Sequence, residues 1–138
     1  MQLSTKSRYG LRAMVELALN YGEGPVSVRE ISENQEISYK YLEHIVSHLK
    51  KKGFLRSVRG AGGGYELKKN PEEITSLQII QALEGTLAPV DCVDSPKLCD
   101  RSDLCPTLGL WVGLQKTVKD YLDSRTLDQL ARNQREVR

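Results

Sequence analysis

The apolar residues of this chain change their spacing at Gly53. Before it, residues 38–52 carry apolar side chains at positions i, i+3, i+4 and i+7, which predicts a helix with one buried face; these side chains are Leu42, Ile45, Val46 and Leu49. After it, residues 54–58 and 65–68 read as two short strands joined by the glycine-rich tip 59–64. A hairpin directly after an amphipathic helix favours the winged helix-turn-helix.

Two shorter helices are predicted before this one. The helical spacing of apolar side chains indicates the first over residues 5–21, and the turn-forming residues 22–25 end it. Ser27 with Glu30 three positions later is the capping-box pattern that starts a second helix. We expect the hydroxyl of Ser38 to cap the following helix. The predicted fold class is mainly α with a small β-hairpin, a winged helix-turn-helix plus a long C-terminal dimerisation helix.

The segments beyond the hairpin divide the chain into two parts. A second capping pattern opens a short helix at Thr75, and residues 87–103 then show no period and read as a loop. Residues 127–130 read as a short helix before a charged tail. We therefore expect a winged helix-turn-helix DNA-binding domain over residues 1–85. The cysteine loop and the dimerisation helix are expected over residues 86–138.

A long helix is predicted from about Leu104 or Pro106 to Asp123. Its seam residues are separated alternately by four and three positions, the heptad spacing of a helix that packs on another helix. We expect this helix to form a homodimer, with Gln115 as the polar member that fixes its register. The apolar residues of the seam are Leu104, Leu108, Trp111, Val118 and Leu122.

The charge of the chain is unevenly distributed. Residues 1–70 carry twelve Lys and Arg against seven Asp and Glu, a net charge of +5, whereas residues 71–138 carry −3. A basic N-terminal half fits a surface that faces DNA phosphates. No segment reads as a membrane span or a signal region, so we expect a cytoplasmic protein without membrane contact. No catalytic arrangement of Ser, His, Asp or Cys stands out, and we expect no enzyme.

The polar face of residues 38–52 carries side chains suited to a DNA groove. Lysine reaches guanine or phosphate, glutamate accepts from the cytosine amino group, and serine and tyrosine donate to phosphate. At the rim of the hairpin, Arg59 is suited to a minor groove, whose negative potential attracts guanidinium. The alternative to DNA contact is that the polar face of this helix only meets solvent and that the hairpin is a plain hairpin with one exposed arginine. The candidates on the helix are Tyr39, Lys40, Glu43, His44 and Ser47.

Cys92, Cys99 and Cys105 lie close together in the predicted loop. Thiols of a cytoplasmic protein stay reduced, and soft thiolates favour an iron–sulfur cluster or zinc. The spacing is not a CxxC pair, so three cysteines without a ligand, one of them a redox sensor, are an equal alternative. His44 and His48 are spaced i, i+4, but a metal there would obstruct the DNA-facing helix, so we interpret them as polar side chains.

Several stretches resemble the IscR/NsrR/CymR-type family of winged-helix regulators, also called the Rrf-two family. The resemblance covers essentially the whole chain, and the hairpin motif over residues 57–65 is its most specific part. It implies a dimer that binds pseudo-palindromic operators in double-stranded DNA. It also implies that the segment 38–47, Ser38 and Tyr41 included, reads the major groove, and that Arg59 with Gly60 meets the minor groove. The other matching stretches are residues 3–10, 41–43, 83–85 and 126–127, with the helix that contains Trp111.

The resemblance implies an iron–sulfur cluster, because members with three cysteines in this loop are cluster sensors. The ligands would be Cys92, Cys99 and Cys105, with [2Fe–2S] favoured over [4Fe–4S]. The fourth ligand is not identified: some members use a histidine where this chain has Leu108, and others a carboxylate where it has Arg8. The remaining candidates are solvent, a residue of the partner subunit, and Asp91, Asp94, Asp100 and Asp103.

Three hypotheses follow for the function. The first is a transcriptional regulator whose operator binding responds to a cluster. The second keeps DNA binding but replaces the cluster by thiol oxidation or by a partner protein of cysteine and sulfur metabolism, as in family members that lack the cysteines. The third is a protein-interaction module whose basic half is incidental; it would bind random DNA without salt dependence.

Overall fold

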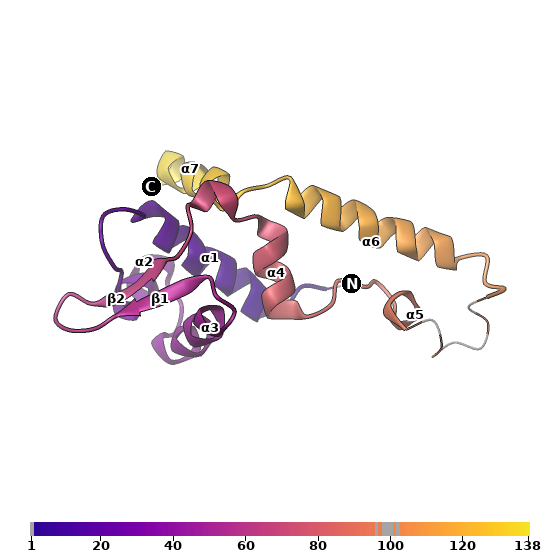
Figure 1. The fold of residues 1–138 in the computed structure, drawn as a ribbon, viewed down its shortest axis with the longest axis horizontal. Coiled ribbons are helices and arrows are strands. Elements are labelled where there is room, and N and C mark those ends of the chain that lie inside the picture. The colour runs from indigo at the N-terminus through magenta and orange to yellow at the C-terminus, as the bar shows by residue number, and fades with distance from the viewer. Residues whose placement is uncertain (1, 96, 98–100, 102) are drawn as a thin grey trace.

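The computed structural model describes residues 2–95, 97, 101 and 103–138 (Figure 1). Its antiparallel hairpin and its helices confirm the predicted fold class. The hairpin loop lies at one end of the long axis in Figure 1, and α6 extends toward the other end. The elements are α1 (Thr5–Leu19), α2 (Val28–Gln35), α3 (Tyr39–Lys51), β1 (Leu55–Val58), β2 (Gly64–Leu67), the 3-10 turn η1 (Pro71–Glu73), α4 (Ser76–Glu84), α5 (Asp91–Asp94), α6 (Leu108–Asp123) and α7 (Leu127–Val137).

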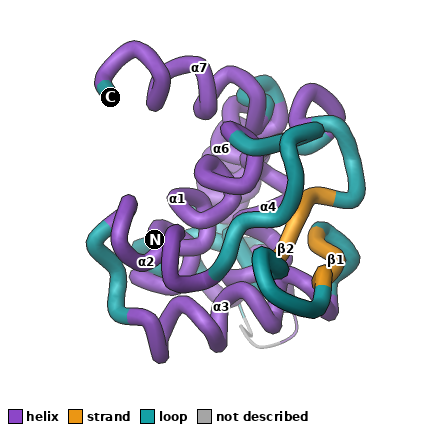
Figure 2. Tube along the Cα trace, turned by 90° about the vertical axis from the view of Figure 1, so that its left-hand side faces the viewer, coloured by secondary structure: helices purple, strands orange, loops and turns teal. Residues whose placement is uncertain are grey.

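Helix α1 lies at the centre of the core, between α3 on one side and α7 on the other (Figure 2). Met14 and Leu17 of α1 are fully or almost fully buried, as is Ile31 of α2. Full burial of each such side chain contributes about 1.5–3 kcal/mol. The stripe predicted for α3 forms its buried face, since all four of its side chains are 0% exposed: Leu42, Ile45, Val46 and Leu49.

The capping box predicted at Thr75 is confirmed, the one predicted at Ser27 is confirmed for its first hydrogen bond, and the cap predicted for α3 is not. The Ser27 hydroxyl accepts from the Glu30 amide at 3.1 Å, and Thr75 and Gln78 exchange both bonds of a capping box. The prediction for Ser38 is wrong, because its side chain makes no capping hydrogen bond with the described residues. The backbone of Ser38, at φ −49° and ψ 128°, departs from the extended geometry of Ser27, at φ −74° and ψ 153°.

The hairpin is anchored at its base. Leu55 pairs with Leu67 across the two strands, and both side chains are buried in the core. Tyr65 and Val26 exchange backbone hydrogen bonds of 2.9 and 2.8 Å, which attach β2 to the segment before α2. This approach requires Gly64, because a Cβ there would lie 2.2 Å from the carbonyl oxygen of Val26. The hairpin therefore leaves the core at a fixed place.

The region around the cysteines differs from its prediction in two respects. The predicted loop contains the short helix α5, and the long helix begins at Leu108. Leu104 was therefore wrongly assigned to that helix; it lies in the preceding turn and is 85% exposed. The reason is Pro106, which disfavours helical backbone at Cys105, the residue before it. None of the described helices is both long and apolar enough to cross a bilayer.

The predicted charged tail is helical, because α7 continues to Val137. Leu127 and Ala131, one turn apart, are 0% exposed and pack in the same core as α1. The helix also starts beside α4, where the Leu127 amide donates to the Ile74 carbonyl at 2.8 Å. The division of the chain at residue 85 stays a prediction, and the core draws side chains from both sides of it.

A buried carboxylate connects α7 to α1 and α2. The Glu16 side chain is 1% exposed and forms an ion pair with Arg138. Gln35 Nε2 donates to Glu16 Oε1 at 2.7 Å, and Asn34 Nδ2 donates to Oε2 at 3.3 Å. Burial alone would raise the pKa of Glu16, but the hydrogen bonds from Arg138, Gln35 and Asn34 outweigh it and hold the pKa below its ordinary value.

We predict that Glu16→Gln destabilises the fold by about 1–3 kcal/mol at neutral pH, since a neutral amide replaces a carboxylate with charged and polar donors. A carboxyl whose pKa is lowered by folding stabilises the protein above its unfolded pKa, and the stabilisation is lost as the pH falls through the folded pKa. Urea unfolding at fixed protein concentration should therefore show a difference between wild type and variant that shrinks below about pH 4.5. A difference that is equal from pH 7 to pH 4 would contradict this role.

Candidate nucleic-acid interface

The outer face of α3 presents the predicted contact residues to solvent. Each side chain assigned to DNA on this helix is exposed, while the opposite stripe is buried in the core. The burial pattern thus places the two faces as the sequence predicts, and their roles in DNA binding remain predictions. The exposed residues are Ser38, Tyr39, Lys40, Tyr41, Glu43, His44 and Ser47.

The first turn of α3 has properties of an anion site. Because Ser38 does not cap it within the described structure, its amides have no side-chain acceptor there, and helix N-termini favour phosphate. Tyr41 is 36% exposed and packs edge-on against Tyr9 of α1, with ring centroids 5.8 Å apart. The Tyr9 contact restrains the Tyr41 ring, so the tyrosine presents a fixed edge at the start of α3.

The hairpin lies beside the C-terminal end of α3 (Figures 1 and 2). Lys50 Nζ donates to Ser57 Oγ at 3.0 Å, which connects the helix to β1. Arg56 and Glu66 form an ion pair of 2.9 Å across the two strands. Arg59 and Gly60 lie beyond these contacts and are exposed at the tip. The polar face of α3 and the exposed Arg59 at the tip therefore belong to two elements that lie side by side.

The two histidines of α3 have different surroundings. His44 is exposed on the outer face, whereas His48 is half-buried. The His48 ring lies toward α4, with Nε2 at 3.1 Å from the carbonyl oxygen of Ala82. The sequence predicts only that both are polar side chains, and the contact with the carbonyl at the end of α4 distinguishes His48 from His44. Neither belongs to a group of metal ligands among the described residues.

The two described cysteines precede α6 in the chain. Cys92 lies on α5 and Cys105 lies just before α6; both are free thiols of intermediate exposure. Cys99 falls outside the described residues. In the described part of the chain, no three His, Cys, Asp or Glu side chains gather into a group that could hold a metal ion. Leu108 opens α6 and Arg8 lies on α1, and neither side chain is a metal ligand.

The surroundings of Cys105 favour its thiolate. A side-chain hydrogen bond with Thr107, whose Oγ1 lies 3.1 Å from Sγ, lowers the pKa of the Cys105 thiol. Backbone hydrogen bonds from Thr107 and Leu108 and the charge of Arg101 lower it further. Thiolate is the form that attacks oxidants and binds soft metals. The chemistry of the described thiols therefore fits an iron–sulfur cluster, and it fits thiol oxidation as well.

Helix α6 carries two apolar stripes. The residues of the predicted seam that lie on α6 are half-buried, since α6 packs on α4 and α5 of its own chain, whereas Leu104 before the helix is exposed. None of the residues of α6, all of them described, is fully buried. A second stripe is more exposed than the seam: Leu110 (62%), Leu114 (40%) and Tyr121 (59%). The sequence did not predict this second stripe, because the heptad spacing indicates only the seam as the packing surface of the helix.

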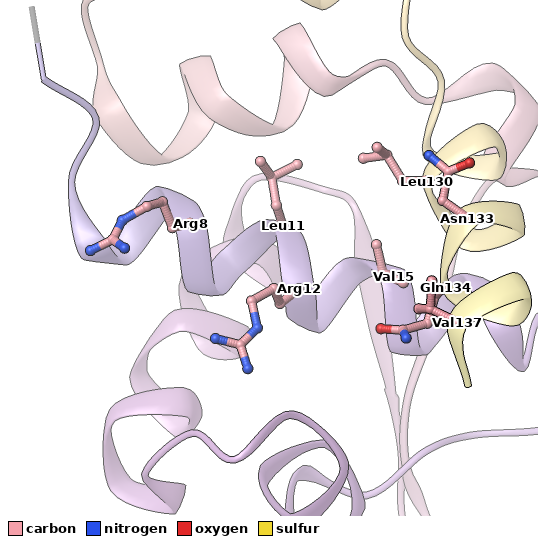
Figure 3. Close-up of a pocket in the computed structure, with 8 residues that line it drawn as sticks. All are labelled: Arg8, Leu11, Arg12, Val15, Leu130, Asn133, Gln134 and Val137. Atoms are coloured by element: carbon pink, nitrogen blue, oxygen red, sulfur yellow. The ribbon is translucent and has the colours of Figure 1, made fainter.

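A cavity of about 470 Å³ opens between α1 and α7 (Figure 3). Leu11 and Val15 of α1 and Leu130 of α7 give it an apolar wall, and Arg8 and Arg12 lie along α1 beside it. Arg12 is already engaged, because its guanidinium donates to Gln35 at the end of α2. This cavity could not be predicted from the sequence, since it depends on how α7 packs against α1.

Comparison with known proteins identifies the family. A model of the Rrf2 family, described as iron-dependent transcriptional regulators, matches residues 3–133. The transcriptional regulator CymR of Bacillus subtilis is 43% identical over 131 residues, which cover 95% of this chain and 90% of that protein. The regulator IscR of Pectobacterium atrosepticum is 42% identical over 133 residues, which cover 96% of this chain and 80% of that protein.

Solved structures agree with these sequence matches. The structure of CymR, the global cysteine regulator of B. subtilis, has a TM-score of 0.81 at 41% identity and covers 96% of this chain and 98% of its own. The structure of T. potens IscR has a TM-score of 0.80 at 38% identity and covers 100% of this chain and 91% of its own. The chain belongs to the Rrf2 family of transcriptional regulators.

Proposed function

We propose that this regulator binds an operator in double-stranded DNA through the outer face of α3 and the hairpin tip. The observation that carries the proposal is the complete separation of α3 into a buried apolar stripe and an exposed polar face. In this assignment Glu43, Lys40 and Ser47 meet base edges and phosphates in the major groove, and Arg59 enters the adjacent minor groove. The protein would act in the cytoplasm and catalyse no reaction.

The active species is a homodimer through α6. This assignment is supported by the apolar surface of α6, which projects from the core and stays open to solvent on one side (Figure 1). The predicted seam and the stripe of Leu110, Leu114 and Tyr121 both contribute to such a contact. A two-fold axis at α6 would present two copies of α3 to the two half-sites of a pseudo-palindromic operator.

Cys92, Cys99 and Cys105 hold an iron–sulfur cluster that controls operator binding. The proposal is supported by the thiolate-favouring surroundings of Cys105, by the similarity to IscR proteins and by the iron-dependent description of the family. When bound, a cluster supplies redox chemistry and sensitivity to oxidants. The chain's own part is to place Cys92 on α5 and Cys105 directly before α6, so that the state of the thiols reaches the dimer helix.

A cluster-free regulator is the alternative. Leu108 supplies no fourth ligand, and CymR of B. subtilis is as similar to this chain as the IscR proteins are. In this alternative an oxidant reacts directly with the partly exposed Cys105 thiolate, or a partner protein of sulfur metabolism covers the cysteine region. The cluster mechanism and the cluster-free mechanism use the same DNA-binding surface. They differ only in what happens at the cysteines.

Iron and acid-labile sulfide contents separate the two mechanisms. We predict that protein purified without oxygen contains both and absorbs visible light, and that a Cys92→Ala, Cys99→Ala, Cys105→Ala variant is colourless. The helical circular dichroism of the variant controls for folding. If wild type and variant give the same colourless protein after anaerobic reconstitution with iron and sulfide, the cluster is excluded and the thiol mechanism takes its place.

The base-reading role of Glu43 predicts a change of sequence preference. Each wild-type contact with a base is worth about 1–3 kcal/mol of discrimination. Duplexes selected from a randomised pool by wild type and by Glu43→Ala should therefore differ at one or two base pairs, while affinity for scrambled DNA stays the same or increases slightly. Glu136→Ala on α7 removes the same charge far from α3 and should leave the selected sequence unchanged. A uniform loss of affinity across all sequences would assign Glu43 to folding instead.

A further inference from the structure

The last turn of α4 is held by a side chain from the recognition helix. The final carbonyls of a helix have no partner within the helix, and Ala82 lies among them. Its carbonyl oxygen lies 3.1 Å from Nε2 of His48 on α3. On the other side of the ring, Nδ1 lies 3.5 Å from Lys6 Nζ of α1. Since the Lys6 distance is long for a hydrogen bond, the Ala82 contact carries most of the restraint.

The nearer partner shows which ring nitrogen donates. A carbonyl can only accept, so Nε2 donates the hydrogen bond to Ala82. Because Nδ1 lies toward Lys6, the ring of His48 on α3 connects α4 and α1 as well. No other residue type of similar shape except glutamine can place an N–H donor at the Nε2 position.

A second contact fixes the same end of α4. Glu84, the last residue of α4, accepts from the Ser4 amide and from Ser7 Oγ, the latter at 2.8 Å. Ser7 is fully buried, and a carboxylate at the start of α1 is favoured by the helix dipole. The end of α4 is therefore attached to α1 through Glu84 and to α3 through His48.

The segment that carries Cys92 follows directly after the end of α4 in the chain. Thr86 Oγ1 donates to Asp94 of α5, the helix that carries Cys92. Asp94 Oδ1 accepts from Gln115 Nε2 of α6 at 3.4 Å. Side-chain contacts, connected to one another by the backbone of residues 82–86, therefore run from α5 and α6 to His48.

We propose that His48 is a positioning residue, which sets the recognition helix against the end of α4 and so connects the cysteine-bearing segment to DNA recognition. The inference rests on the proposed operator binding by α3. His48 itself touches no DNA in this assignment, because its ring is turned into the protein. Its hydrogen bond fixes the rotation of α3 about its axis, on which the alignment of the outer face with the bases depends.

The test compares His48→Leu, which removes both ring nitrogens, with His48→Gln, which keeps a donor for Ala82. The matched control is Gln81→Leu, a substitution at an exposed neighbour on α4. Dissociation constants are measured by fluorescence anisotropy for a duplex selected by the wild-type protein and for a scrambled duplex of equal length. Hydrogen exchange of the peptide spanning residues 79–90 is measured without DNA.

We expect His48→Leu to lose about 2- to 10-fold in affinity for the selected duplex, the effect of one neutral hydrogen bond. Affinity for the scrambled duplex should be unchanged, and residues 79–90 should exchange faster. His48→Gln should restore both quantities to within about twofold, and Gln81→Leu should match wild type.

Three results would overturn the inference. The first is wild-type affinity of His48→Leu for the selected duplex, even with faster exchange, because the contact would then be only structural. The second is an equal loss for both duplexes, and the third is a His48→Gln variant as weak as His48→Leu. Equal binding of wild type to both duplexes would instead refute operator binding itself, and the exchange experiment would still test whether His48 holds the end of α4.

Discussion

The close packing of α1 against α4, α3 and α7 determines how these four helices lie relative to one another. A Cβ at Gly10 would lie 2.2 Å from Cδ1 of Leu83, so a larger residue would require the Leu83 side chain to move. The buried side of α1 also receives α3, and α7 packs against it as well. Because protein interiors are close-packed, a displacement of α1 would move α3 and the end of α4 together.

Polar contacts determine how the helices and the hairpin are oriented around this apolar core. The bridge between Val26 and Tyr65 orients the hairpin, and Lys50 connects it to α3. Glu16 attaches the far end of α7 to the helices beneath it, and Glu84 attaches the end of α4 to the start of α1. Hydrophobic burial is non-directional, so these contacts specify one arrangement among the many that would bury the same area.

The sequence predicted those features that depend on local spacing. The stripe of α3, the hairpin and the capping of α2 and α4 follow from residues that are neighbours in the chain, and these predictions are confirmed. The predictions for Ser38, for Leu104 and for the charged tail were wrong for related reasons. Each concerns an element whose ends depend on backbone geometry or on distant packing, as when α7 is completed by its contacts with α1.

Some features of the candidate site could likewise be predicted from the sequence, and others could not. The outer face of α3 could be predicted because burial of one stripe exposes the other. The inward orientation of His48 could not be predicted, because it depends on the Ala82 carbonyl of α4. The exposed stripe of α6 could not be predicted either, because it depends on how α6 packs against α4 and α5.

The salt dependence of DNA binding tests the central claim, recognition by α3 and the hairpin, most directly. Phosphate contacts release counterions, so the affinities for a selected and a scrambled duplex should both fall as salt is raised. At physiological salt, the selected duplex should bind about 10³-fold or more tightly than the scrambled one. Equal affinity for the two duplexes, or affinities that do not change with salt, would contradict the account.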